Sequence, residues 1–273
     1  MSYSAFFGFK HEPFTSDINA KNLLKLPSMV SVKERFDYIL NGGVLIVTGE
    51  VGSGKSTSLR WSQSHYHSSQ YLFLNITATG GSLNEFYRQL CWALEVEAKS
   101  GSRVGLLREF KANIREIATT KKQKIIVVVD EAHLLRTEVF AELHTITQFD
   151  NDSKNLFSIV LAGQPNLLEK LTYRSSAPLA SRVIARTHLS NLNQDQMAVY
   201  LEHHLAVAGI KKQLFTDQAI TGIYQGSAGI LRKANSLARG ALIAAATEKE
   251  SSVSAEHVRL LISALDNQHC IAS

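Results

Sequence analysis

Residues 49–56, which read GEVGSGKS, constrain this chain more than any other part of the sequence. They follow an apolar run at 44–48 and precede a helical pattern at 56–66. The segment fits the pattern GxxxxGK[ST] and lies between a strand and a helix, as that pattern requires. Glycines allow backbone N–H groups to turn inward around phosphates, and the helix N-terminus adds the positive end of its dipole. The sequence therefore predicts a phosphate-binding loop.

Two side chains of this loop have distinct predicted roles. Lys55 is expected to reach the β- and γ-phosphates of ATP, and the Ser56 hydroxyl is expected to bind Mg²⁺. The alternative is a glycine-rich turn that binds no ligand. The residues predicted to contact the nucleotide are Gly49, Glu50, Val51, Gly52, Ser53, Gly54, Lys55, Ser56 and Thr57.

A second motif, IIVVVDE at 125–131, has the form of a Walker B element. Its continuous β-branched run indicates a strand buried on both faces. Asp130, at the end of that strand, is expected to hold Mg²⁺ through the ion's water shell, and Glu131 is expected to act as general base. The alternative is a helix cap, but the phosphate loop upstream favours the catalytic interpretation.

The same segment, DEAH at 130–133, is also the signature of DEAH-box helicases. Such helicases need a second RecA-like domain, and only about 140 residues follow His133, most of them helical in pattern. We therefore interpret His133 as a residue of the loop or helix after the strand, not as a coupling histidine.

Hydrophobic periodicity predicts an α/β fold, a P-loop domain whose parallel sheet is flanked by helices, followed by a small all-helical lid. The predicted strands are 44–48, 71–76, 125–129 and 156–162, and the predicted helices are 56–66, 82–94, 104–118, 194–208, 217–225, 230–247 and 254–265. Ser82 is the expected N-cap of the second helix, with Glu85 completing a capping box. We place the domains at 1–189 and 190–273.

Composition excludes several classes of protein. An apolar fraction of 45% and a charged fraction of 19% are ordinary for a soluble globular chain. Cys91 and Cys270 are isolated, which predicts neither a zinc site nor a disulfide framework. No secretory leader or membrane-spanning run is present, so we expect a cytoplasmic protein that does not contact the membrane. A net charge of +5 permits an acidic partner, although an ordinary solvated surface explains it equally well.

Several short segments together resemble the ExeA/GspA group of AAA+ ATPases. They are FFG at 6–8, PF at 13–14, the GEVGSGKS loop, VVVDEAHLL at 127–135, LAGQP at 161–165 and GILRKAN at 229–235. This group is related by mechanism to the transposition ATPases MuB, TnsC and IstB. The resemblance covers nearly the whole chain and implies an ATPase that uses Mg²⁺ and forms a homo-oligomer.

The resemblance implies three further site residues. Gln164 would contact the γ-phosphate or the lytic water, although asparagine or threonine is usual across AAA+ proteins, and the alternative is a turn residue before a proline. Arg182 would be a trans-acting arginine finger, with Arg186 as the second candidate and a surface charge as the alternative for either. Arg232 would be a sensor arginine, in a GxPR pattern where Leu231 replaces the proline.

The aromatic residues of the N-terminal segment are a weaker candidate site. In relatives the corresponding segment walls the adenine pocket, and the alternative is that the rings cover core. The residues concerned are Phe6, Phe7, Phe9 and Phe14.

Two biological roles fit these residues. In the favoured one, the protein binds duplex DNA independently of sequence, depends on ATP to do so, and serves a transposase. The basic net charge supports it, loops 99–103 and 121–124 offer phosphate contacts, and the chain ends without the membrane and periplasmic regions of full-length secretion members. The alternative is a cytoplasmic ATPase of a secretion or cell-envelope assembly system that acts on a protein partner. A third, more generic role is a stand-alone regulatory ATPase with a protein client.

Overall fold

The computed structural model describes residues 2–15, 18–98, 100–150 and 153–271, with side chains described as far as residue 263. Contacts within the chain separate two compact units. The helical unit consists of Met1–Lys25, Val51–Gly54 and Ser190–Ser273, and the sheet unit consists of Leu26–Glu50 and Lys55–Leu189. The sheet unit ends at Leu189, and the first 25 residues group with the helical unit. The division into domains at 1–189 and 190–273 stays a prediction.

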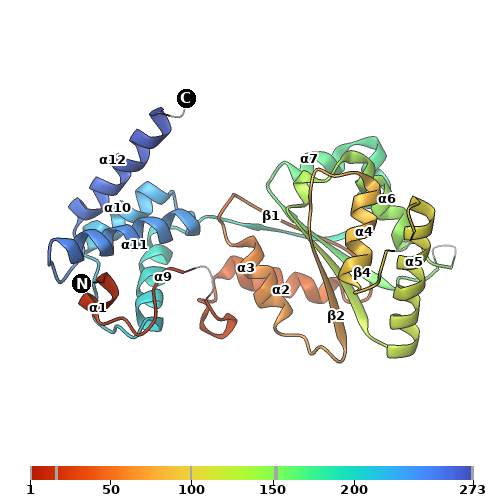
Figure 1. Cartoon of the computed structure of the whole chain (residues 1–273), viewed down its shortest axis with the longest axis horizontal. Helices are drawn as coiled ribbons and strands as arrows, with labels where there is room; N and C mark the ends of the chain where they lie inside the picture. Colours follow the sequence, from red (N-terminus) through yellow and green to blue (C-terminus); the bar gives the residue numbers. More distant parts are fainter. Residues whose placement is uncertain (1, 16–17, 99, 151–152, 272–273) are drawn as a thin grey trace. The chain divides into compact units, whose positions relative to one another are not determined.

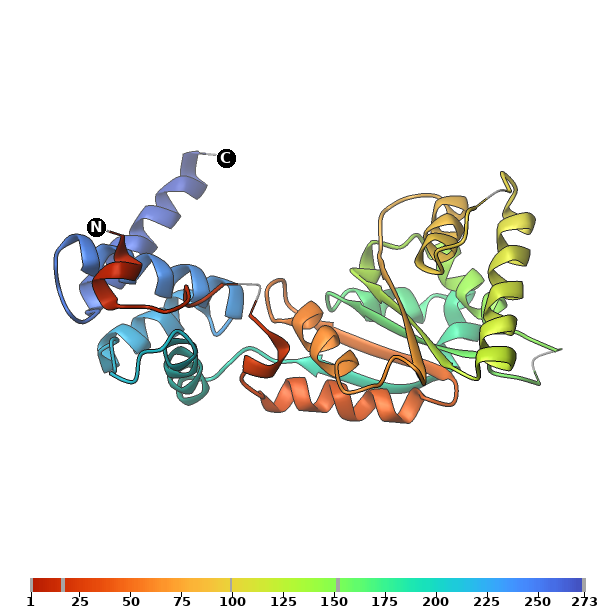
Figure 2. The same cartoon turned by 60° about the horizontal axis from the view of Figure 1, so that its bottom comes forward.

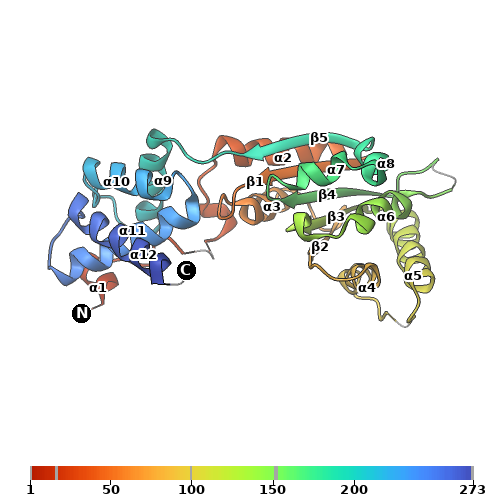
Figure 3. The ribbon, with the colours of Figure 1, turned by 90° about the horizontal axis from the view of Figure 1, so that it is seen from above.

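Among the described residues, the sheet unit contains five parallel strands in the order β2-β3-β4-β1-β5, labelled in part in Figure 1 and in full in Figure 3. Their bounds are Gly43–Gly49 (β1), Tyr71–Thr77 (β2), Lys124–Asp130 (β3), Phe157–Gly163 (β4) and Val183–Leu189 (β5). Helical crossovers connect consecutive strands, as parallel pairing demands. The predicted α/β fold with a parallel sheet and a C-terminal helical region is confirmed.

Alternate residues of each central strand point into two different cores. In β3, Val127 and Val129 face one core, and Val128 faces the other. Neighbouring β4 repeats the pattern, with Leu161 in the first core and Val160 in the second. This two-residue alternation fixes the strand faces, and burial on both faces explains why these strands read as unbroken apolar runs.

Different helices cover the two faces of the sheet, as Figures 2 and 3 show. The first core contains α4 (Leu83–Ala93), α5 (Arg103–Glu116) and α6 (Thr137–Thr147). The second contains α2 (Pro27–Ile39) and α3 (Lys55–Gln63). The short helix α7 (Leu167–Thr172) follows β4 and also contributes to the first core, and α8 (Ala177–Ala180) precedes β5.

Most predicted elements of the sheet unit are present, but α2 and β5 were missed. Ser82 caps α4 as predicted, with its hydroxyl accepting the Glu85 amide at 3.4 Å. Helix α2 starts at a proline, and its N-cap residue, Leu26, provides no side-chain hydrogen bond, so the usual start signal is absent. Strand β5 is an edge strand with only partial burial.

The helical unit is built from four helices and the N-terminal segment. The helices are α9 (Gln194–Val207), α10 (Asp217–Ser227), α11 (Leu231–Thr247) and α12 (Ala255–Ile271), and the N-terminal segment contributes α1 (Tyr3–Phe7). The amide of Lys10 donates to the Ala208 carbonyl at 2.9 Å, and Arg239 pairs with Glu12 at 3.3 Å. These contacts attach the N-terminal segment to the helices.

The N-terminal aromatic residues pack within this helical unit. Phe14 is buried, its ring stacked on His204 at 5.1 Å between centroids and edge-on to Phe215 at 6.0 Å. Phe6 and Phe7 line a groove of the same unit. For Phe14 these contacts match the alternative in which the ring covers core.

The cysteines and the hydrophobicity of the helices were the subject of two predictions from composition. Cys91 is a buried free thiol, and burial raises its pKa; the side chain of Cys270 lies outside the described side chains. None of the helices in the described part of the chain is long and apolar enough to cross a bilayer.

His204 makes the stability of the helical unit depend on pH. Burial lowers its pKa from 6.5 to about 4, and the nearby His203 acts in the same direction. Between these values the unfolded chain binds the proton more strongly than the folded chain does, so stability is present above pH 6.5 and is lost as pH falls toward 4. The loss should be on the order of 2 kcal/mol by pH 5. Urea unfolding at pH 7.5 and pH 5 measures it.

His204→Phe should remove most of this difference because the apolar ring does not titrate. His67→Phe, the same change at an exposed position, is the matched control and should keep it. If His204→Phe and wild type lost equal amounts of stability between pH 7.5 and pH 5, another group would be responsible for the pH dependence.

Candidate nucleotide site at the carboxyl ends of the strands

The sheet brings the ends of β1, β3 and β4 to one edge. Thr48 pairs with Gly163 across β1 and β4, and Val129 pairs with Leu161 across β3 and β4. Residues that follow these strands leave the sheet side by side. In open parallel sheets the carboxyl edge is where ligands bind.

The phosphate loop has the backbone that its glycines were predicted to allow. Gly52 and Gly54 adopt φ angles of +82° and +92°, a region that favours glycine. Ser53 between them is buried, and its hydroxyl has no hydrogen-bond partner within the protein. A buried hydroxyl without a partner in a glycine-rich loop is suited to an oxygen-rich ligand such as a phosphate group.

Lys55 begins α3 and is only 6% exposed. Its ammonium donates to the carbonyl of Gly49 at 2.9 Å and to that of Glu50 at 3.0 Å. These two bonds hold the cation against the loop. The arrangement fits a lysine that exchanges carbonyl partners for phosphate oxygens.

Ser56 and Asp130, the two predicted magnesium ligands, are in direct contact. The Ser56 hydroxyl donates to Asp130 Oδ2 at 2.6 Å, and Asp130 Oδ1 accepts the Glu131 amide at 2.8 Å. The residues are 74 positions apart in the sequence. A hydroxyl and a carboxylate on adjacent elements are the hard oxygen ligands that Mg²⁺ prefers, so these residues fit the ion.

Glu131 and Gln164 both contact one histidine ring. His133, in the short turn η3 (Ala132–Leu134), is 8% exposed. Its Nδ1 lies 3.3 Å from Glu131 Oε2 and 3.4 Å from the Gln164 amide nitrogen. Its Nε2 lies 3.0 Å from the Gln164 side-chain nitrogen. The predicted base and the predicted polar residue after β4 are thus joined through one imidazole.

Two backbone features place this ring. Glu131 has a φ of +54°, a left-handed conformation that is uncommon outside glycine. Gly163 faces the histidine so closely that a Cβ there would lie 3.0 Å from the His133 amide nitrogen and 3.2 Å from Nδ1. A side chain at position 163 would therefore press on the ring.

The two arginine-finger candidates differ in environment. Arg182, just before β5, is partly buried, and its Nε donates to His144 Nδ1 at 3.0 Å. Arg186 is exposed on β5. The bond to His144, a residue of α6, holds the Arg182 guanidinium against that helix.

Arg232 lies in the first turn of α11 and is exposed. Residues Val51–Gly54 group with the helical unit, and within it the Arg232 amide donates to the Gly52 carbonyl at 3.1 Å. The predicted sensor arginine therefore meets one residue of the phosphate loop through its backbone.

Comparison with known proteins identifies the family of this chain. Residues 39–171 match a family model described as an AAA domain. The chain is 31% identical over 249 residues to general secretion pathway protein A of Aeromonas hydrophila, covering 89% of this chain and 45% of that protein. This chain is an AAA domain protein, homologous to general secretion pathway protein A. It spans less than half of that relative's length.

Solved structures show the same fold. The Aeropyrum pernix ORC2 protein, in ADPNP–ADP complexes, matches with a TM-score of 0.72 and 16% identity, covering 93% of this chain and 72% of that one. The Aeropyrum pernix ORC1 protein, in complex with DNA, matches with a TM-score of 0.68 and 18% identity, covering 92% of this chain and 68% of that one. At this level of identity the likeness establishes the AAA+ fold.

Sequence reasoning placed His133 in the loop or helix after the strand, where η3 has it, but missed its contacts with Glu131 and Gln164. The DEAH motif gave one indication, because it places an imidazole two residues after the predicted base. The motif does not predict the contact with Gln164, which is 31 residues away in the sequence and is brought close by the fold.

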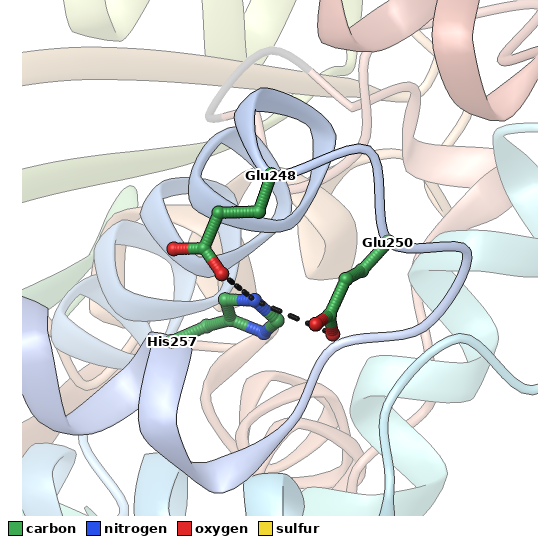
Figure 4. Close-up of side chains that lie close together, drawn as sticks. All are labelled: Glu248, Glu250 and His257. Atoms are coloured by element: carbon green, nitrogen blue, oxygen red, sulfur yellow. Dashed lines mark hydrogen bonds and ion pairs between the residues drawn. The ribbon is translucent and has the colours of Figure 1, made fainter.

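A second cluster of possible ligands lies in the helical unit, where Glu248 and Glu250 converge on His257 (Figure 4). His257 Nε2 lies 3.2 Å from Glu248 and 3.7 Å from Glu250. Its Nδ1 accepts the backbone N–H of Ser254 at 2.9 Å. While Nδ1 accepts this bond, Nε2 carries the hydrogen of a neutral ring and faces the carboxylates as donor. Ser254 precedes α12 and His257 lies in its first turn, so the bond between them caps the start of the helix.

Proposed function

We propose that this chain binds ATP with Mg²⁺ and hydrolyses it. The observation that carries the proposal is the contact of Ser56 with Asp130 at 2.6 Å, beside the buried Lys55 of the phosphate loop. The match to an AAA domain over residues 39–171 supports it. We also propose that the nucleotide domain and the lid divide at 189/190.

The predicted site residues have complementary tasks in this proposal. Lys55 and the loop amides bind the phosphates, and Ser56 and Asp130 hold Mg²⁺, which would neutralise charge that develops on the phosphate oxygens. Glu131 accepts the proton of the attacking water. Gln164 orients that water or contacts the γ-phosphate through its amide. The Glu131 side chain is 40% exposed, which leaves it open to water.

Two substitutions separate binding from chemistry. Lys55→Ala should abolish detectable ATP binding because it removes the cation at the phosphate loop. Glu131→Gln should keep ATP binding and lower kcat on the order of 100-fold or more, since an amide cannot accept the proton. Titration with a fluorescent ATP analogue measures the first effect, and phosphate release measures the second. Unchanged turnover in Glu131→Gln would remove that residue from the mechanism.

We propose further that the ATPase acts as a homo-oligomer in which Arg182 reaches the nucleotide of a neighbouring subunit. The bond from its Nε to His144 fixes the plane of the guanidinium. A preoriented guanidinium loses less entropy when it pairs with a phosphate. We propose that Arg232 acts in its own subunit, from the first turn of α11.

A trans-acting arginine makes turnover depend on assembly. Turnover per subunit should rise with protein concentration in wild type. Arg182→Ala should bind ATP but lose this rise, with kcat lower on the order of 1000-fold in the assembled state. Arg186→Ala, the matched change four residues later on β5, should keep the rise of turnover with protein concentration. If turnover per subunit stayed constant on dilution and the monomer were fully active, the assignment of Arg182 would be wrong. If only Arg186→Ala lost the concentration dependence, Arg186 would be the trans-acting residue.

For the biological role we propose a protein partner in a secretion or cell-envelope assembly system. The named relative is a general secretion pathway protein, which favours this alternative over the transposition role. The chain covers 45% of that relative's length, so the point at which it ends does not separate the two roles. The proposed partner is a component of the same secretion system, recognised in the ATP-bound state.

ATP-dependent binding of duplex DNA is the second candidate. A net charge of +5 supports it. Two loops, 99–103 and 121–124, were expected to contact phosphates. Lys99, in the first of them, lies outside the described residues. Arg103 is paired with Glu142, and Lys124 donates to Asn41 at 3.0 Å. These two engaged side chains contribute less to binding phosphates, whereas Lys121 and Lys122 of the second loop are exposed.

A titration separates these candidates. Anisotropy of a labelled duplex should show no ATP-dependent binding at low salt with Mg²⁺ if the client is a protein. ATP-dependent binding that varies little with sequence and weakens steeply with salt would instead support the DNA role, because each neutralised phosphate releases counterions. A hydrolysis-deficient Glu131→Gln protein, loaded with ATP, is the best form to titrate.

A further inference from the structure

We propose that His133 is a positioning residue that couples the orientation of the Gln164 amide to the availability of the Glu131 carboxylate. The coupling operates by exchange of the imidazole tautomer. It rests on the ATPase function proposed above. The contacts that carry it all lie within the sheet unit.

The first step concerns Nδ1, which has two incompatible neighbours. The Gln164 backbone N–H, 3.4 Å away, can only donate. The Glu131 carboxylate, 3.3 Å away, accepts when ionised. A neutral imidazole carries one hydrogen, so Nδ1 serves either the amide, as acceptor, or the carboxylate, as donor.

The second step concerns Nε2, which faces the Gln164 side chain at 3.0 Å. An amide presents an NH₂ donor on one side and a carbonyl acceptor on the other, and a half-turn of the group exchanges them. If Nδ1 carries the hydrogen, Nε2 accepts from the Gln164 NH₂, and the carbonyl oxygen points away from the ring. If Nε2 carries the hydrogen, it donates to the Gln164 carbonyl, and the NH₂ points away.

The two steps together define two neutral states. In the holding state, Nδ1–H donates to Glu131 and Gln164 presents its oxygen away from the ring. In the released state, Nε2–H donates to the Gln164 oxygen, Gln164 presents NH₂, and Glu131 is free of the ring. The change moves one proton from Nδ1 to Nε2 by exchange with water, and net charge is unchanged.

A γ-phosphate selects between these states because its oxygens accept hydrogen bonds. In contact with it, Gln164 must present NH₂, which requires Nε2–H and frees Glu131 to accept a proton from water. Without it, the holding state withdraws the carboxylate. His133 thus makes the base available when the phosphate to be cleaved is present.

The backbone conformation keeps Glu131, His133 and Gln164 in contact. The left-handed Glu131 turns the chain so that residues 131 and 133 face the same side. Gly163 gives the ring its room, since a Cβ at that position would approach Nδ1 to 3.2 Å. Such local strain persists where surrounding structure holds it, and it concentrates at functional sites.

Substitutions at position 133 separate the two contacts. In His133→Asn, the amide sits near the position of Nδ1, keeps its donation to Glu131 and cannot sense Gln164. In His133→Gln, the amide reaches the position of Nε2 and contacts Gln164 alone. We expect kcat to fall on the order of 100-fold in His133→Asn and 10-fold in His133→Gln, because the base is withdrawn or Gln164 is unsupported. The KM for ATP should stay near that of wild type.

A double-mutant cycle adds a readout that loss of packing alone would not produce. Gln164→Ala should lower kcat in wild type but add little in His133→Asn, where the relay is already broken. His257→Asn changes another buried histidine, one outside this site, and should leave kcat unchanged. Wild-type turnover in His133→Asn, or fully additive losses with Gln164→Ala, would overturn the proposal.

The tautomer can be observed directly in the wild-type chain. With ¹⁵N-labelled histidine, the ring-nitrogen shifts of His133 should report Nδ1–H with ADP and Nε2–H with a non-hydrolysable ATP analogue. Comparison with His133→Gln assigns the signals. The same tautomer with both nucleotides would overturn the proposal, even if the variants fold poorly. A wild-type protein that shows the tautomer change but does not hydrolyse ATP would instead contradict the proposed ATPase function.

Discussion

The parallel pairing of β3 with β4 is the constraint on which the rest of the site depends. Val129 opposite Leu161 means that the two strands end within one residue of each other, so Glu131 and Gln164 leave the sheet close together. A slip of one residue would turn every side chain of the strand to the opposite face. The register resists such a slip because both faces of these strands are buried in apolar cores. Packing of the sheet therefore determines the relative positions of the two proposed site residues.

Parts of the fold that are specified locally could be predicted from the sequence. The strands β1, β3 and β4 are continuous apolar runs, and α4 has both a regular apolar stripe and a serine cap. By contrast, β5 reads VIARTHL, a mixed sequence whose strand form depends on pairing with β1. The attachment of the N-terminal segment to the helical unit rests on contacts across nearly 200 residues or more, such as Lys10 with Ala208. Periodicity carries no information on such pairings.

The site divides in the same way. The positions of Lys55 and Ser56 follow from a contiguous motif, and Asp130 and Glu131 follow from a strand end. The contacts of His133 do not, because they require a glycine at 163 on a different strand. The bond of Arg182 to His144 likewise joins residues 38 apart. Sequence motifs identify groups with fixed chemical roles, whereas the groups that connect them are recognised only once the chain is folded.

This division has a chemical reason. The loop amides and the Lys55 ammonium can only donate hydrogen bonds, and the ionised carboxylates can only accept them. Such groups can bind a phosphate or a metal ion, but their hydrogen-bonding role stays the same whichever nucleotide is bound, because a donor remains a donor and an acceptor remains an acceptor. An imidazole and a side-chain amide can each exchange donor for acceptor without changing charge. When they are in contact, as His133 and Gln164 are at 3.0 Å, one cannot exchange without the other. In the mechanism that we propose, a framework of fixed polarity binds the nucleotide, and this one reversible pair distinguishes ATP from its product.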